Sequence, residues 1–495
     1  MPLPSIPSGN VASATASTGY EIANSCLFND NDSAYMHRTF GTPTNVDKWT
    51  FSVWLKRSSI MTGASQKLLN AYVSGNAYHM VQFSSGSTAD RFNHYDHDTA
   101  MSPADTGETT SGDYRDVGGW YHLVVIYDSG NSDADLRTRL FVNGAEPSFS
   151  SVTNPGQNND SVINRAIAHQ LGAVQSPAQY FDGYMAEAIF CDGQAYTADN
   201  FGEYDTDSPS IWKPKDPSGL TFGDNGWWLD FEDGADLGKD VSGEGNHFTE
   251  VNFAAADQCI DSPTNNLCTL NPLHMSDPSA NFFVDNGNNT LEATNNDVDR
   301  LVGATIHPQG IKGYFEFKIL TDSNFRVALQ EDGVGLTKNN YTALANGQFW
   351  GLDSSGHLAY ANGGSSATLT SGYISSPSNG NIIGCAFDFT GSNRNVWFHV
   401  NGTYGNNGSG VGNPATGAYP GLSVTQLALT KEFEFVFMCN TGGSSSSIGL
   451  NFGNGSYDGT AISSAGTNAS FGKFEYDCPS GFGAICSKTK NGTYE

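Results

Sequence analysis

The sequence predicts an all-β fold made of two tandem antiparallel β-sandwiches, and three observations support this prediction. The chain of 495 residues is rich in glycine (57 residues) and aromatic residues (12%) but poor in charged residues (15%), as is typical of short strands joined by tight turns. Several runs alternate apolar and polar residues with a period of two, which is the pattern of a strand with one buried face. Asn-Gly, Asp-Gly and Ser-Gly pairs, which favour turns between strands, recur along the chain.

The first sandwich is expected over residues 19–204, after an extended arm at residues 1–18. This arm, which is rich in Pro, Ser, Ala and Thr, either docks on a neighbouring molecule or remains a free terminus. The clearest strand is the run WTFSVWLK, in which Trp49, Phe51, Val53 and Leu55 share one face.

Further strands of this sandwich are expected at residues 119–128, before the hairpin pair Asn143-Gly144, and at residues 183–190. Two long polar stretches, residues 84–99 and 103–116, are expected as loops between strands.

Residues 205–270 are predicted as a connector. Pro209, Pro214 and Pro217 interrupt any regular ladder, because proline donates no backbone hydrogen bond. The apolar run at residues 227–231 then predicts a strap that packs aromatic side chains against a neighbour. Just before the connector, Thr197 is placed to cap one short helical turn.

The second sandwich is expected over residues 271–477, followed by a tail at residues 478–495 with no readable structure. In residues 313–319, Phe315, Phe317 and Ile319 face one way while Tyr314, Glu316 and Lys318 face the other. Residues 382–402 are predicted as a hairpin whose second strand ends in Asn401-Gly402.

Two resemblances follow from these runs. WTFSVWLKRS, GWYHLVVIYD, RLFVNG and YFDGYMAEAIFCDG together resemble the laminin-G-like (concanavalin A-like) jelly roll, in the version found in virion proteins of bacterial viruses. In that version a run like SAYMHRTF precedes the first strand, and a segment like WWLDFEDGADLGKDVSGEGNHFTEVNF follows the jelly roll. GYFEFKI, VGL, FWGLDSSG, IIGCAFDF, VWFHVNG and NFGNG resemble, in this order, the SPRY (B30.2-like) domain.

The net charge of −28 argues against nucleic acid as a partner, because phosphate binding requires clustered Lys and Arg. The charge equally disfavours binding to anionic membranes. A sufficient explanation is that acidity keeps a secreted or particle-borne protein soluble. The first 21 residues lack a basic segment and an apolar core, so no secretion signal is expected, and no stretch approaches 18 apolar residues.

The eight cysteines are dispersed without a C-x-x-C pair, which supports neither a zinc site nor a thioredoxin-type motif. Buried free thiols are expected, with Cys478–Cys486 as the pair best placed if a bridge exists. The cysteines are Cys26, Cys191, Cys259, Cys268, Cys385, Cys439, Cys478 and Cys486.

Carboxylate pairs were weighed as glycosidase candidates, since such enzymes place two carboxylates across one sugar. Glu432 and Glu434 are expected on the solvated outer face of an amphipathic strand, and Glu232-Asp233 lies beside a turn. His122 and His399 are expected to be structural because they lie among apolar neighbours. No nucleophile elbow and no phosphate-binding loop occurs.

Two groups were weighed as metal ligands. His94, Asp96, His97 and Asp98 could bind a divalent ion, but in a polar loop their geometry would not be preset. Asp30 and Asp32 could bind calcium, although they lack the spacing of an EF-hand loop. We expect no metal, no cofactor and no catalytic residue, and the ligand-binding residues remain unknown.

The resemblance implies a bacteriophage virion protein that is exposed on the particle and assembled in the host cytoplasm. We expect a tail fibre or receptor-binding adhesin that contacts host surface glycans, without catalysis or membrane insertion. Its expected partners are other virion proteins and further copies of itself, with a trimer favoured. The alternative is a capsid-decoration or head-fibre protein, and a polysaccharide-degrading tail spike comes third.

Overall fold

The structure is a computed structural model that describes residues 19–60, 63–206, 208–276, 281–294, 300–321, 324–332, 336, 348–362, 365–439, 445–467 and 469–491. The predicted arm at residues 1–18 lies outside them. The chain divides into a first unit that ends at Thr264 and a second unit that starts at Asn265. Among the described residues, no helix is long and apolar enough to cross a membrane.

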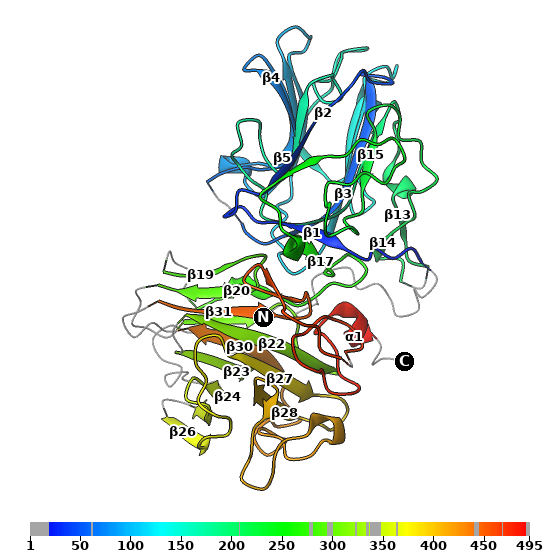
Figure 1. Cartoon of the computed structure of the whole chain (residues 1–495). Coiled ribbons are helices and arrows are strands. Elements are labelled where there is room, and N and C mark those ends of the chain that lie inside the picture. Colours follow the sequence, from blue (N-terminus) through cyan, green and yellow to red (C-terminus); the bar gives the residue numbers. More distant parts are fainter. Residues whose placement is uncertain are drawn as a thin grey trace. The chain divides into compact units, whose positions relative to one another are not determined.

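The first unit is a sandwich of two antiparallel sheets (Figure 1). In spatial order, the seven-stranded sheet contains β17 (Gln258–Cys259), β1 (Ser25–Phe28), β12 (Gly183–Asp192), β3 (Lys48–Arg57), β8 (Tyr121–Asp128) and β9 (Thr138–Val142), with β15 (Trp227–Leu229) paired to β12. The eight-stranded sheet contains β10 (Phe149–Thr153), β7 (Asp105–Thr110), β6 (Phe92–Asp98), β5 (Ala77–Phe83), β4 (Gln66–Ser74), β11 (Ala168–Leu171), β2 (Tyr35–Thr39) and β16 (Thr249–Val251). A separate ribbon pairs β13 (Gly202–Tyr204) with β14 (Trp212–Pro214).

The core between these sheets contains the predicted face of β3. Trp49, Phe51, Val53 and Leu55 are all fully buried in one cluster, as their alternation predicts. Asn143 and Gly144 both adopt positive φ (50° and 81°), which closes the two-residue hairpin turn after β9.

Residues 205–264 belong to the first unit, so the prediction of a separate connector over residues 205–270 needs correction. Trp227 and Leu229 on β15 pair with β12 and are fully buried in the same core as β3. Within this segment, β16 and β17 extend the two sheets. Pro209 and Pro217 lie outside the strands, and Pro214 ends β14, whose partner is β13 alone. The turn predicted after Thr197 is a 3₁₀ turn at Ala198–Asn200, although the Thr197 side chain accepts no capping bond there.

The two polar stretches predicted as loops contain β6 and β7, which is a second correction. In β6, Phe92, His94, Asp96 and Asp98 point inward and are buried, while the residues between them are partly exposed. In β7, Thr106, Glu108 and Thr110 point inward in the same way. Both strands carry polar residues on both faces, so a search for apolar alternation could not find them.

The second unit is also a sandwich of two antiparallel sheets. The β30 sheet contains β18 (Leu270–Met275), β21 (Arg300–Ala304), β30 (Phe433–Cys439), β23 (Phe325–Glu331), β24 (Gln348–Asp353), β25 (Leu358–Asn362) and β26 (Ser365–Thr370). The β22 sheet contains β19 (Phe282–Asp285), β20 (Thr290–Ala293), β31 (Ser446–Asn451), β22 (Lys312–Thr321), β27 (Ile382–Asp388), β28 (Asn395–Val400) and β29 (Thr403–Tyr404). Shorter elements are β32 (Ser456–Tyr457), β33 (Thr460–Ala461) and α1 (Ser487–Asn491).

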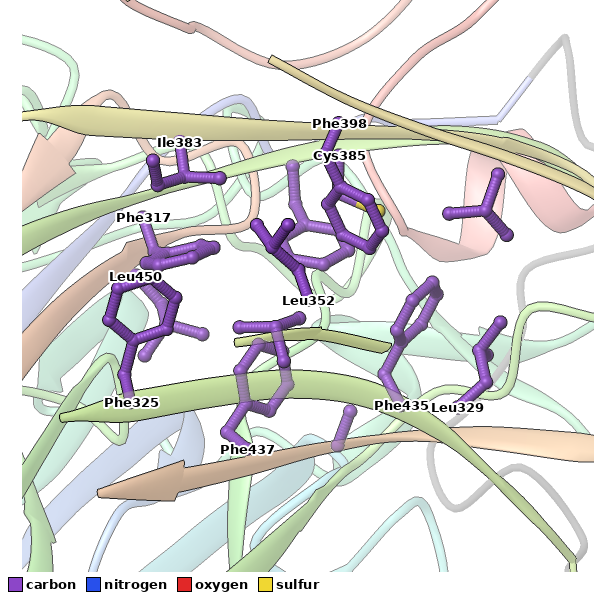
Figure 2. Packing of buried hydrophobic residues seen from close by; sticks show 14 of the residues in the cluster. Phe317, Phe325, Leu329, Leu352, Ile383, Cys385, Phe398, Phe435, Phe437 and Leu450 are labelled. Atoms are coloured by element: carbon purple, nitrogen blue, oxygen red, sulfur yellow. The ribbon is translucent and has the colours of Figure 1, made fainter. Parts of the chain in front are cut away.

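Apolar side chains from the two sheets fill the space between them. Figure 2 shows Phe317, Ile383 and Phe398 of the β22 sheet on one side of the core and Phe325 and Phe437 of the β30 sheet on the other. The prediction of two tandem antiparallel β-sandwiches is therefore confirmed.

The opposite face of β22 is buried too, because the C-terminal segment packs on it. The Glu316 carboxylate accepts hydrogen bonds from the hydroxyls of Tyr314 and Tyr457 and from the backbone N–H groups of Glu475 and Tyr476. The tail after residue 477, in which the sequence showed no readable structure, contains α1 and packs with the second unit. Its buried side chains are Cys478, Phe482, Ala484, Ile485 and Cys486.

All eight cysteines are buried free thiols. Cys478 and Cys486, the pair best placed for a bridge by sequence, are not joined. Burial raises the pKa of both thiols, so neither carries the thiolate character of a reactive cysteine.

Candidate functional site

The eight-stranded sheet carries a row of aromatic side chains on its solvent side. Strand register places Tyr72 opposite Tyr78, Tyr78 opposite His97, and His97 opposite Asp105, so these four side chains emerge from the same face of β4, β5, β6 and β7. The Tyr72 and Tyr78 rings stack with centroids 6.2 Å apart, and the Tyr78 and His97 rings stack at 5.0 Å. Tyr95 lies beside Tyr78 at 5.9 Å. We name Tyr72, Tyr78, Tyr95 and His97 the aromatic row.

Asp105 ends the aromatic row with a carboxylate. It accepts a hydrogen bond from the Tyr95 hydroxyl and lies 2.6 Å from Nδ1 of His97. These two contacts hold the pKa of Asp105 below its usual range, so the group is an anion at neutral pH. Its side chain is 61% exposed, which leaves it open to a ligand.

No side chain projects from the strand position opposite Tyr95, because that position is Gly107. This residue lies opposite Tyr95, and a Cβ added to it would lie 2.1 Å from the backbone oxygen of His94. Because Gly107 also has φ of 136°, a residue with a side chain would be strained there. The Tyr95 ring therefore borders a flat backbone surface.

Such an arrangement suits a sugar. Aromatic rings offer large apolar area with little conformational entropy to lose, and the C–H groups of a pyranose can pack on the parts of the rings that stacking leaves open. An ionised carboxylate at the edge accepts hydrogen bonds from hydroxyl groups. Successive rings lie on adjacent strands, so an extended glycan could contact several of them.

The inner face of the same strands holds a buried polar chain. The Asp96 carboxylate lies 3.4 Å from Nδ1 of His79, Nε2 of His79 lies 3.4 Å from Nδ1 of His94, and Nε2 of His94 lies 3.3 Å from the Glu108 carboxylate. Each of these four residues is at most 5% exposed. Thr138 of the opposite sheet also lies 2.6 Å from Nε2 of His94, so the chain links the two sheets. Burial closes these groups to a substrate, and the Thr138–His94 contact joins the two sheets.

Ser52 and His122 form a hydrogen-bonded pair, which invites comparison with a nucleophile and its base. Oγ of Ser52 lies 2.9 Å from Nε2 of His122, while Nδ1 of His122 accepts from the Trp212 indole N–H at 3.0 Å. Because indole nitrogen can only donate, Nδ1 carries no proton and Nε2 must be the protonated nitrogen of the neutral ring. His122 thus donates to Ser52 and cannot take its proton, as a general base would have to do. Burial lowers the pKa of His122 to about 3, which keeps the ring neutral.

The carboxylates weighed by sequence do not form a pair. Glu432 is exposed, whereas Glu434 is 3% exposed and lies 3.0 Å from Nε2 of His274, so the expected solvated position of Glu434 is wrong. The His274 side chain reaches Glu434 from β18 across Gly303 of β21, the strand that lies between β18 and β30 in the sheet. Asp233 forms an ion pair with Lys239 at 3.0 Å.

The residues weighed as metal ligands are not brought together. His94, Asp96 and Asp98 point inward and His97 points outward, and Asp98 pairs with Arg165 at 2.7 Å. Asp32 accepts from the Asn29 side chain in a turn. Among the described residues, no three His, Cys, Asp or Glu side chains gather in a group that could hold a metal ion.

Sequence reasoning missed the aromatic row. Its members are spread over three strands, one of which was predicted as a loop, and only strand register brings them together. The alternation of Asn93, Tyr95 and His97 with buried residues was the available signal, but it was hidden because the buried residues are polar.

Comparison with known proteins identifies part of the chain. Residues 29–199 match the family model of the concanavalin A-like lectin/glucanases superfamily. No curated protein matches the sequence.

Three solved structures show weaker likeness. A protein from Bacteroides ovatus with a proposed carbohydrate-binding role is 13% identical and covers 47% of this chain and 58% of its own, with a TM-score of 0.32. Domains LG4-5 of the mouse laminin α1 chain are 10% identical and cover 93% of this chain and 97% of their own, with a TM-score of 0.30. The PSpry domain of TRIM65 is 10% identical and covers 37% of this chain and 88% of its own, with a TM-score of 0.24.

At these TM-scores the solved structures carry no argument about function, and a SPRY-like second unit stays a prediction. The family model does test residues 29–199 of the chain. The prediction of a concanavalin A-like domain there is confirmed.

Proposed function

We propose that this protein is a carbohydrate-binding protein without catalytic activity, and that the aromatic row of the first unit is its binding surface. The observation that carries this proposal is the register that aligns Tyr72, Tyr78 and His97 on one exposed face and ends at the ionised Asp105. The match of residues 29–199 to a superfamily that includes lectins supports it.

We further propose a setting on a bacteriophage particle, as a tail fibre or other adhesin that recognises glycans of the host envelope. This setting is supported by the resemblance of the first sandwich and its following segment to virion proteins. A single shallow aromatic surface binds weakly, and repeated copies on a symmetric particle could raise avidity by roughly 10²–10⁴ without any new contact. Trimers are the proposed assembly, formed in the host cytoplasm.

Glycan binding is tested with the purified full-length chain on an array of bacterial surface polysaccharides. The wild type should bind a subset of them, and Tyr78→Ala should weaken that binding. Tyr204→Ala is the matched control, since Tyr204 is a tyrosine of the same unit that is 46% exposed and lies outside the aromatic row. Equal binding by all three proteins would contradict the proposed surface, and release of reducing sugar would contradict the absence of catalysis.

The setting needs a separate test. An adhesin should bind host cells and compete with infection, and labelling with an antibody should place it on the tail. Many copies on the head, with no binding to cells, would favour the alternative of capsid decoration.

A further inference from the structure

The described part of the second unit contains an open pocket of about 340 Å³. This volume falls in the range of pockets that bind small molecules. Three parts of the chain form it: the start of β22 with Lys312, the turn after β27 with Thr390, and the C-terminal segment that packs beside them. The lining residues are Lys312, Thr390, Ser470, Phe471, Gly481, Lys488 and Thr489.

The charge of this pocket differs from that of the chain. The sequence has 51 acidic and 23 basic residues, yet the described lining residues include two lysines and no carboxylate. Lys312 lies 3.4 Å from Asp388, which is not among the described lining residues. An ammonium group has three donors, so this ion pair leaves Lys312 able to bind a further acceptor. A local positive field in an acidic protein favours an anion.

The hydroxyl groups of the lining indicate what the anion is attached to. The Thr390 hydroxyl donates to Asp388 at 2.6 Å, and the Ser470 hydroxyl donates to the backbone oxygen of Phe482 at 2.8 Å. Because both protons are used inside the protein, the two oxygens face a ligand as hydrogen-bond acceptors. A ligand that fills the pocket should therefore carry an anionic group for the lysines and hydroxyl donors for these oxygens.

An apolar surface completes the lining. The Phe471 side chain is 38% exposed, and Nζ of Lys488 lies 6.0 Å from its ring centroid. A ring beside a cation and two acceptors matches the mixed character of a sugar, which has both a C–H face and hydroxyl groups. Inorganic phosphate alone would leave the ring and most of the volume without contact.

We propose that this pocket is a second binding site, distinct from the aromatic row, and that it takes a small anionic sugar. The anionic group, a carboxylate or a phosphate, lies between Lys312 and Lys488, and the sugar hydroxyls donate to Thr390 and Ser470. Because no residue of this site belongs to the first unit, the site does not depend on the function proposed for the aromatic row.

The test is a ligand-observed NMR titration of the full-length Tyr78→Ala protein, in which the aromatic row is weakened. Four probes are compared: glucuronate, glucose 6-phosphate, glucose and inorganic phosphate. We expect glucuronate or glucose 6-phosphate to bind at least tenfold more tightly than glucose and more tightly than inorganic phosphate. The stronger of the two identifies whether the natural anion is a carboxylate or a phosphate.

Lys488→Gln should weaken the preferred sugar about tenfold, which is the effect of losing one charge-assisted hydrogen bond. Lys473→Gln is the matched control, an exposed lysine of the same unit outside the lining. Binding by wild type should also weaken as salt is raised from low to physiological concentration. Equal binding of glucose and the anionic sugars, or equal loss in Lys473→Gln and Lys488→Gln, would overturn the proposal, as would no binding of either anionic sugar at millimolar concentration.

Discussion

The first unit should fold as residues 19–264 and fail to fold as residues 19–204. The longer fragment contains β15, β16, β17 and the segments between them, which the sequence had assigned to a connector. Their contribution to the core can be estimated from five buried apolar side chains, each at most 5% exposed and all in the same cluster as β3. These are Trp227, Leu229, Phe231, Leu237 and Phe248.

Full burial of one such side chain contributes about 1.5–3 kcal/mol, so five of them contribute about 8–15 kcal/mol. The free energy of unfolding of a whole domain is about 5–15 kcal/mol. Removal of residues 205–264 therefore costs about as much free energy as the whole unit gains on folding. In the full-length chain, Trp227→Ala alone should cost about 3–5 kcal/mol, because it leaves a cavity at a fully buried position.

Both fragments are compared by circular dichroism and urea denaturation, and the Trp227→Ala protein is compared with wild type. The control is Trp228→Ala, since Trp228 is the next residue on β15 but is partly exposed and points to the other face. Cooperative unfolding of fragment 19–204 at nearly the urea concentration of fragment 19–264 would refute the reasoning. So would a loss below about 1 kcal/mol in Trp227→Ala, which is the effect expected of a surface position.

Three further predictions follow from single side chains. Tyr78→Ala should weaken glycan binding about two- to tenfold, which is the effect of losing one aromatic contact. Tyr78→Phe keeps the ring and should bind with the affinity of wild type in the same titration. An equal loss of affinity in Tyr78→Ala and Tyr78→Phe would contradict a contact made by the ring. Burial raises the pKa of Glu187 from 4.5 to about 8, so its contribution to the free energy of unfolding is full below pH 4.5 and is lost as pH rises toward 8. Between pH 5 and 8, the free energy of unfolding of wild type, measured in urea, should fall by about 3–5 kcal/mol relative to that of Glu187→Gln. Parallel dependence of the two free energies on pH would argue against this origin. Glu316→Ala should lower the free energy of unfolding of the second unit by about 3–5 kcal/mol, because it leaves the hydroxyls of two buried tyrosines and two half-buried backbone N–H groups without their acceptor. The exposed Glu432→Ala should change it by less than about 0.5 kcal/mol.

The sequence predicted those strands that alternate apolar with polar residues. Trp49 to Leu55 and Phe315 to Ile319 lie in the cores as expected, because each strand buries one apolar face. Both Asn-Gly turns were also found, since Asn401 and Gly402, like Asn143 and Gly144, adopt the positive φ that these residues tolerate best.

Two of the segments that sequence reasoning misplaced, the predicted connector and the C-terminal tail, share one physical property: each contributes side chains that cover the second face of a strand. On β22, alternation places Tyr314 and Glu316 on the face opposite Phe315, and the C-terminal segment packs over that face. On β3, Trp54 is buried as fully as its apolar-face neighbours because residues 194–264 pack against that side. The burial of such a residue cannot be predicted from its neighbours in the sequence, because the segment that covers it is distant in the chain and irregular.

The aromatic row and the buried polar chain depend on the same register. Along β6, inward His94 and Asp96 alternate with outward Tyr95 and His97, so a slip of one residue would exchange the two faces. That exchange would bring Tyr95 into the core and would leave Thr138 of the opposite sheet without the His94 ring. Burying a polar group without a partner costs about 1–3 kcal/mol, so the inner hydrogen bonds disfavour such a one-residue slip. The polar inner face that hid β6 in the sequence is therefore what fixes the tyrosines and His97 in line on the outside.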